Sequence, residues 1–273
     1  MKKILFFILF TNLCFSQKRI TVLDSISKKP ISYTSIWDDN IHYKTADSLG
    51  VFIVDETFKS KTIKITALGF EDKNANLLVN KIYLAPKTIL LNEVRITKRK
   101  NEYKLKLGKA KKNGALMCLQ YDSKSGIVAK FFPNSKQENI YLDKIKLYSN
   151  TSTKNRIFEI SIFSVNENGE PDKILNTENI IARPKKGTSV NTIDVSDLNI
   201  LFPKEGIFVA INYMLLEQNK NFDTDSNHPQ AFFYEPCFYL TNSEVYRDTW
   251  YFKDAKWNKN SKYSLNLATE FGN

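Results

Sequence analysis

Residues 83–98 read YLAPKTILLNEVRITK, and this stretch separates two unlike parts of the chain. The part before it is rich in turn residues, whereas the part after it is longer and more aromatic. A chain of 273 residues is long enough for two modest domains, each with its own apolar core. We therefore expect a first domain over residues 17–97 and a second over residues 114–273.

Short β-strands are expected throughout the first domain. The run TIKIT places Ile63 and Ile65 at alternate positions, the period of two that is typical of a half-buried strand. Asp47 and Gly50 bracket a tight turn, because an aspartate can bond its own downstream backbone and a glycine accepts positive φ. Together with ITVL, ISYTSIW, VFIV, KIYL and ILLNEVRI, this pattern gives about seven strands and predicts an all-β sandwich.

Five of these segments carry a family resemblance. The succession VLDSISKKPI, TADSLGVF, ALGF, IYLAP and LNEVRI, over residues 18–97, resembles the carboxypeptidase-regulatory-like domain, a prealbumin-type β-sandwich. The glycine that often precedes the first valine in that family is absent, and Ile20 and Thr21 stand there. The resemblance implies a non-catalytic module of the kind found in secreted envelope proteins and ahead of TonB-dependent receptors. Only about 175 residues follow, too few for a receptor barrel.

The amino terminus, MKKILFFILFTNLCFSQ, predicts a secretory signal peptide over residues 1–16, with cleavage before Gln17. Reading Cys14 as a lipoprotein cysteine is the alternative, although Thr11, Asn12 and Leu13 are not the small residues that this requires. No later segment has the length of a membrane helix. We expect an exported protein without a transmembrane segment, located in the periplasm, at the outer-membrane periphery or outside the cell.

Two cysteines remain after signal cleavage, Cys118 and Cys237. In an oxidising compartment they either form a disulfide or pack as two buried thiols, and the sequence leaves both alternatives open.

Residues 98–113 hold eight basic residues and one acid. They are expected to form a solvated linker, with contact to an anionic surface as the alternative.

The second domain also consists of short apolar runs separated by Asn, Gly, Pro and Lys. About ten such runs predict a larger β-sandwich of jelly-roll type. Its layout loosely resembles carbohydrate-binding β-sandwich modules, with strands at KIKLYS and FEISIFSV, the turn NENGEPDK and a late hairpin that carries two tryptophans. The resemblance is one of layout alone.

Aromatic residues crowd between residues 232 and 257. Exposed Trp and Tyr provide flat platforms for sugar rings, so the ligand-binding candidates are Trp250, Trp257, Tyr251 and Tyr246. The alternative is that these rings fill the core.

A weak metal candidate precedes the aromatic segment. Asp223, Asp225 and Asn227 have the opening spacing of a calcium loop, but His228 stands where the glycine belongs. No cofactor is expected, and no catalytic motif or nominated nucleophile is present.

These observations predict a non-catalytic binding or scaffold protein of the cell envelope, in which the first domain docks and the second binds glycan. The alternative is a structural partner of an outer-membrane transport complex, which predicts an apolar or strand-edge patch on the first domain. A hydrolase would need two carboxylates that converge in a cleft. The net charge of +11 favours anionic surfaces, but an exported protein is not expected to bind nucleic acid.

Overall fold

The computed structural model describes residues 18–55, 58, 60–87, 103–120, 126–135, 140–222, 231–242, 248–260 and 262–273. The protein is all-β, as predicted, and its only helical segments within those ranges are two 3-10 turns, η2 (Ser196–Leu198) and η3 (Glu217–Asn219). No helix in them is long and apolar enough to cross a membrane. The signal peptide prediction lies outside the described residues.

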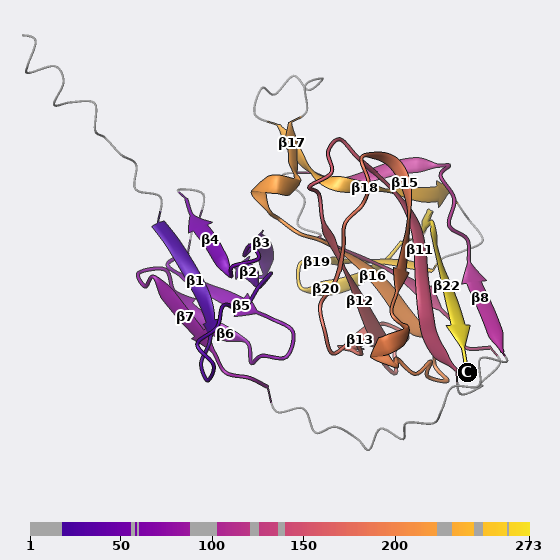
Figure 1. Cartoon of the computed structure of the whole chain (residues 1–273), viewed down its shortest axis with the longest axis horizontal. Coiled ribbons are helices and arrows are strands. Elements are labelled where there is room, and N and C mark those ends of the chain that lie inside the picture. Colours follow the sequence, from indigo (N-terminus) through magenta and orange to yellow (C-terminus); the bar gives the residue numbers. More distant parts are fainter. Residues whose placement is uncertain are drawn as a thin grey trace, which may run out of the picture.

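Seven strands form the first domain, in two sheets (Figure 1). They are β1 (Lys18–Asp24), β2 (Ser35–Asp38), β3 (Ile41–Thr45), β4 (Val51–Val54), β5 (Thr62–Thr66), β6 (Lys73–Asn76) and β7 (Lys81–Leu84). One sheet has the order β4-β1-β7, with β1 and β7 parallel, and the other has the order β3-β2-β5-β6. Their facing side chains form a separate apolar core, so this domain is a small sandwich.

The local chemistry of the first domain follows the sequence closely. In β5 the side chains of Ile63 and Ile65 are buried while Lys64 is exposed. At the turn before β4, the Asp47 carboxylate accepts the Val51 N–H at 2.9 Å. Gly50 has φ +68°, and a Cβ there would stand 2.8 Å from the Val22 carbonyl oxygen, so only glycine fits.

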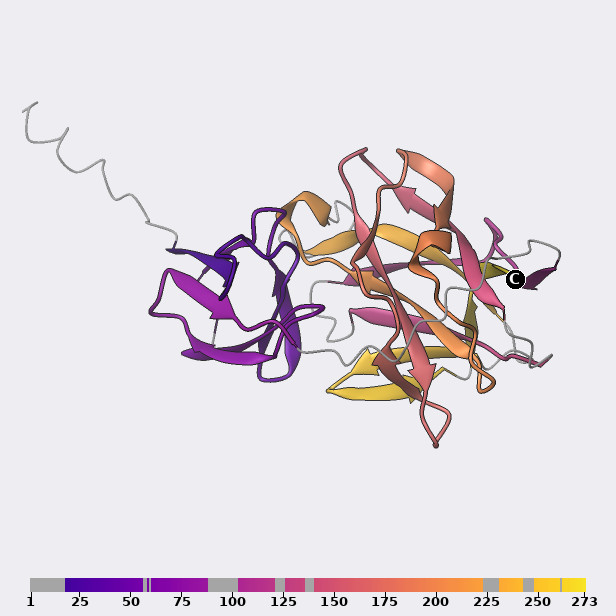
Figure 2. The same ribbon diagram turned by 60° about the horizontal axis from the view of Figure 1, so that its bottom comes forward.

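The second domain packs a seven-stranded sheet against an eight-stranded sheet (Figure 2). The seven-stranded sheet contains β10 (Ile127–Phe132), β12 (Phe158–Val165), β13 (Pro171–Ile174), β14 (Ile180–Ala182), β16 (Ile207–Tyr213), β19 (Thr249–Lys253) and β20 (Lys256–Lys259). The eight-stranded sheet contains β8 (Lys104–Gly108), β9 (Ala115–Gln120), β11 (Tyr141–Thr151), β15 (Gly187–Asp194), β17 (Lys220–Phe222), β18 (Phe232–Asn242), β21 (Tyr263–Leu265) and β22 (Leu267–Gly272). The main apolar core lies between them.

Strand β8 corrects the expected linker. It falls inside residues 98–113 and pairs with β22 from Lys104 to Gly108, so the second domain begins before Gly114. Leu105 and Leu107 pack against the core. Because Lys104 and Lys106 alternate with these leucines, they point to solvent from an ordered edge strand.

The two domains contact each other through the β2–β3 hairpin of the first and the turn before it. The Thr45 N–H donates to the Leu215 carbonyl at 3.3 Å, and the Leu215 N–H donates to the Thr45 hydroxyl at 3.0 Å. The Trp37 ring meets Phe252 edge-on at 6.2 Å. Tyr33 packs against an apolar cluster of the second domain that comprises Ile157, Met214 and Leu216.

Candidate functional site

The late tryptophans lie on the outer face of the seven-stranded sheet, away from the main core. Trp250 packs edge-on against Phe208 at 5.9 Å, and Trp257 packs edge-on against Phe163 at 5.6 Å. Both tryptophans are half-buried and belong to a satellite apolar cluster on that sheet. Their main contacts are therefore with the protein's own rings.

The other binding candidates predicted from the sequence are not placed beside the two tryptophans. Tyr251 alternates with Trp250 along β19, so its ring faces the main core, and its hydroxyl accepts the Asn260 amide at 3.0 Å. Tyr246 lies outside the described residues, as does the proposed calcium loop with Asp223, Asp225 and Asn227. Among the described residues, no group of three His, Cys, Asp or Glu side chains is placed to hold a metal ion.

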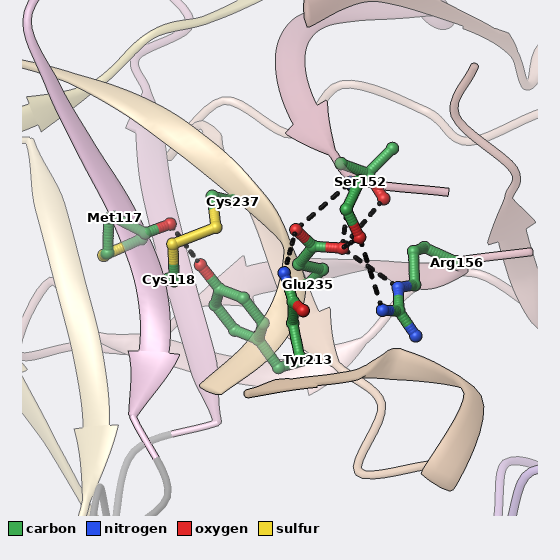
Figure 3. The surroundings of a disulfide bond; sticks show 9 residues. Met117, Cys118, Ser152, Arg156, Tyr213, Glu235 and Cys237 are labelled. Atoms are coloured by element: carbon green, nitrogen blue, oxygen red, sulfur yellow. Dashed lines mark hydrogen bonds and ion pairs between the residues drawn. A yellow bond between two sulfur atoms is a disulfide. The ribbon is translucent and has the colours of Figure 1, made fainter. Parts of the chain in front are cut away.

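Of the two cysteine alternatives, the structure has the disulfide: Cys118 of β9 is bonded to Cys237 of β18 (Figure 3). The β9–β18 pairing shifts its register between Tyr234 and Phe238, so the disulfide lies in a bulge. Such a bulge turns side chains away from their usual alternation. Here it directs Glu235 into a buried polar network.

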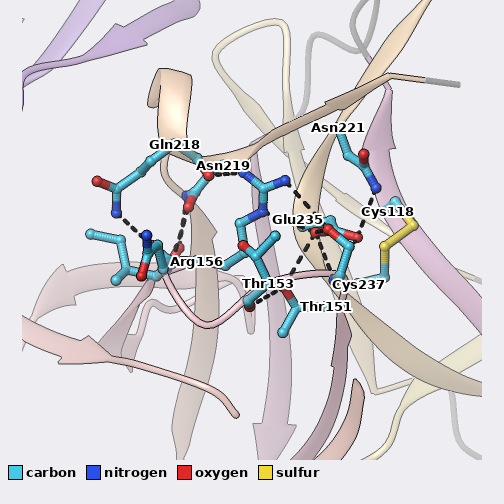
Figure 4. Close-up of polar contacts among 12 residues, drawn as sticks. Cys118, Thr151, Thr153, Arg156, Gln218, Asn219, Asn221, Glu235 and Cys237 are labelled. Atoms are coloured by element: carbon cyan, nitrogen blue, oxygen red, sulfur yellow. Dashed lines mark hydrogen bonds and ion pairs between the residues drawn. A yellow bond between two sulfur atoms is a disulfide. The ribbon is translucent and has the colours of Figure 1, made fainter. Parts of the chain in front are cut away.

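Glu235 is 5% exposed and forms an ion pair with Arg156, with 3.0 Å between Oε2 and Nε (Figure 4). The same carboxylate accepts the Ser152 N–H at 3.0 Å and the Asn221 amide at 3.1 Å. Burial opposes ionisation, but these donors outweigh it and hold the pKa of Glu235 below its ordinary value. A carboxylate held in this way is a poor general base, and its partners join the segment after β11 to β17.

The network also supports the loop that contacts the first domain. The Arg156 guanidinium donates to the Gln218 carbonyl. The Asn219 side chain, fully buried, accepts the Ile157 N–H at 3.0 Å and donates to the Met214 carbonyl at 2.9 Å. Residues 214–219 are thereby fixed where they meet Thr45.

A row of four side chains, none of them a candidate from the sequence, crosses the outer face of the eight-stranded sheet. Backbone register places Tyr239 of β18 opposite Leu116 of β9, and Tyr148 of β11 opposite Val190 of β15. The β11–β18 ladder, in which Ser149 faces Phe238, brings Tyr148 opposite Tyr239. We call Leu116, Tyr239, Tyr148 and Val190 the tyrosine row.

The two ends of the tyrosine row are open to solvent. Leu116 is 43% exposed and Val190 is 53% exposed, and the two tyrosines between them are half-buried. Four strands about 4.8 Å apart make the row roughly 14 Å wide. The Tyr239 hydroxyl shares a hydrogen bond of 3.1 Å with the Thr188 hydroxyl, which fixes the ring on the face.

A charged groove of about 470 Å³ lies further along the same face. Glu270 of β22 stands between two lysines, 3.1 Å from Lys106 and 2.6 Å from Lys146. The Lys146 and Lys106 ammonium groups hold the pKa of Glu270 below its ordinary value, against an opposing effect of burial. The groove thus combines fixed donors and acceptors.

The outer edge of β4 in the first domain is closed by the Lys44 side chain and by the backbone of Asp47. Lys44 donates to the Ile53 carbonyl at 2.9 Å, and the Asp47 N–H donates to the Val51 carbonyl at 2.9 Å. An incoming strand needs these carbonyl groups, so lysine and aspartate block strand addition here.

The geometry defines a two-sandwich all-β protein with one aromatic and polar sheet face. No family model matches the chain, and no curated protein matches it. Among solved structures, it is similar to the clostridial cysteine protease Cwp84 after propeptide cleavage, with 11% identity and a TM-score of 0.41 over 84% of this chain and 50% of that one. It is also similar to infectious bursal disease virus-derived particles, with 8% identity and a TM-score of 0.30 over 88% of this chain and 58% of that one. The chain thus spans about half the length of these proteins, and TM-scores this low identify neither family nor function.

Proposed function

We propose that this chain is an exported, non-catalytic binding protein of the cell envelope, and that its second domain binds glycan. The first domain, which resembles a carboxypeptidase-regulatory-like module, acts as the docking module. The closed edge of β4 is one edge at which this domain cannot add a strand of an outer-membrane complex.

The tyrosine row carries the proposal. Two tyrosines on neighbouring strands of one sheet face give a broad contact area at small entropic cost, and their hydroxyl groups add polar contacts. Thr188 and Thr192, both exposed on β15, add hydroxyl groups on either side of Val190. Rings flanked by hydroxyl groups suit a sugar, which has apolar faces and polar edges.

The test is retention of the chain from Gln17 onwards on a panel of immobilised polysaccharides, at low and high salt. We expect salt-resistant retention that weakens roughly 30-fold in Tyr148→Ala or Tyr239→Ala, as for loss of a central aromatic contact of about 2 kcal/mol. Tyr263→Ala is the matched control, because Tyr263 is a 37% exposed tyrosine of the same domain that lies outside the row.

Retention that both row variants keep would refute the proposed site. Retention lost in Trp250→Ala or Trp257→Ala, while the row variants still bind, would move the site to the seven-stranded sheet. Retention that vanishes with salt in every variant would indicate charge attraction alone.

A further inference from the structure

We propose that the ligand is an uncharged, polyhydroxylated glycan whose chain runs from the tyrosine row along β11 into the charged groove. This inference rests on the glycan-binding function proposed above and specifies its ligand class. It also assigns the groove as a second subsite of the same face.

The two features share one strand face. Tyr148, Lys146 and Lys144 occupy alternate positions of β11, and the groove is lined by Lys144 and Glu270. Alternate residues point to the same side of a strand, at about 3.3 Å per residue, so Tyr148 and Lys144 are about 13 Å apart. An extended chain of a few sugar rings is needed to cover that distance, and a single ring is too short.

The surface between the tyrosine row and the charged groove is continuous along β11. Lys146 is opposite Thr192 of β15 and Ala268 of β22, which lie between the row and the groove. Threonine is exposed here and alanine is small, so no bulky side chain from these two positions stands between the two features. A chain lying along β11 can therefore contact both.

The groove favours an uncharged ligand because it offers charges of both signs. Three lysines and four carboxylates line it, a net charge of −1 from 3 minus 4. The carboxylates, which repel an anionic chain, are Asp143, Asp194, Asp197 and Glu270, whereas the lysines repel a cationic one. A hydroxyl group both donates and accepts, so each hydroxyl finds a partner of either kind.

Several of these groups are already held in place. Glu270 binds Lys106 and Lys146 together, and Lys144 stands 3.9 Å from Asp194. Side chains that are ordered before binding lose less conformational entropy when the ligand arrives. Around Glu270 the groove therefore presents donors and acceptors that are partly ordered before binding.

Two groove residues, Lys104 and Asp197, are exposed, so substituting them tests the groove with little effect on the fold. The double variant Lys104→Met/Asp197→Leu keeps side-chain size approximately and removes the hydrogen-bonding groups of both side chains. Its matched control is Lys173→Met/Asp172→Leu on β13, an exposed pair of the same kind in the other sheet. Affinities for soluble neutral β-glucan oligosaccharides of two to eight units, for polygalacturonate and for chitosan are measured by calorimetry at low and high salt.

We expect the neutral oligosaccharides to bind with little salt dependence and more tightly as they lengthen. The groove variant should lose roughly 5- to 100-fold in affinity for the longest oligosaccharides, the equivalent of two hydrogen bonds, and should match the parent for disaccharides. The control pair should bind every oligosaccharide as the parent does.

Three results would overturn the inference in distinguishable ways. Tighter, salt-sensitive binding of polygalacturonate or chitosan, lost in Tyr148→Ala, would refute the uncharged class and keep the glycan function. An unchanged affinity of the groove variant for the longest oligosaccharides would refute the second subsite. Failure of the folded parent to bind any of the three glycan classes would refute this inference together with the function on which it rests.

Discussion

Replacing Glu235 by alanine should destabilise the second domain more than most single substitutions would. The change leaves the Arg156 guanidinium buried, since Arg156 is only 8% exposed, and removes its charged partner. It also leaves the donors of Ser152 and Asn221 without the oxygens that they bond in the native chain. Unpaired buried charge is costly because the protein interior cannot replace the lost hydration.

The expected magnitude follows from these contacts. Removing one partner of a buried ion pair costs about 3–5 kcal/mol. For a domain of this size, each kcal/mol lowers the melting temperature by about 2–4 °C, so Glu235→Ala should melt roughly 6–20 °C below the parent. Urea unfolding of the oxidised protein, followed by tryptophan fluorescence, checks the free energy directly.

Two further variants separate the effect of the Glu235 charge from the effect of its side-chain packing. Glu235→Gln keeps the shape and should lose less stability than Glu235→Ala, because its amide oxygen still accepts hydrogen bonds. Arg156→Met/Glu235→Leu removes both charges and should recover much of the loss. A double variant as unstable as Glu235→Ala, or a loss below about 1 kcal/mol in Glu235→Ala, would refute the reasoning.

The pH dependence gives an independent check. Because the pKa of Glu235 is lower in the folded protein than its ordinary value of 4.5, the folded state binds fewer protons there than the unfolded state. The carboxylate therefore contributes its full stability above about pH 4.5, and this contribution is lost as the pH falls through the folded pKa. Glu235→Gln should lose that part of the acid dependence.

Three other predictions concern stability. Reducing the Cys118–Cys237 disulfide, which closes a loop of 119 residues, should cost about 4–5 kcal/mol in urea unfolding. Burial lowers the pKa of His42 to about 4 from 6.5, so thermal stability should fall as the pH drops from 6.5 towards 4, and His42→Gln should flatten this fall. Trp257→Ala should lower the unfolding free energy by about 1–3 kcal/mol, less than a fully buried aromatic loses, while the folded fraction retains glycan binding. A stable Trp257→Ala that no longer binds would contradict the packing role.

The fold class could be predicted because it depends on local patterns. Alternation in β5 and the turn from Asp47 to Gly50 each use residues close in the chain, and both appear in the structure as expected. The same alternation was present at KLKLG in the basic segment, where the charge suggested a linker. There the alternating Leu105 and Leu107 indicated the strand correctly, because their packing against the core holds β8 on the sheet.

The candidate site could not be predicted in the same way, because it depends on pairing between distant strands. Trp250 and Trp257 have charged neighbours in sequence, which favoured exposure, yet they pack edge-on against Phe208 and Phe163 of other strands and are half-buried. Tyr148 and Tyr239 are separated by 91 positions (239 minus 148), and only the β11–β18 register brings them together. No pattern within either strand indicates which residues of β11 and β18 are paired.

The core sets the register on which the tyrosine row depends. A slip of one residue in β18 would exchange its two faces, so Tyr239 would enter the core and Phe238 would leave it. Phe238 is fully buried between the rings of Phe158 and Tyr213, so the slip would expose a large apolar side chain and break both ring contacts. The disulfide at Cys237 adds a covalent restraint next to that position. The proposed binding face is therefore held in place by residues that no ligand would contact.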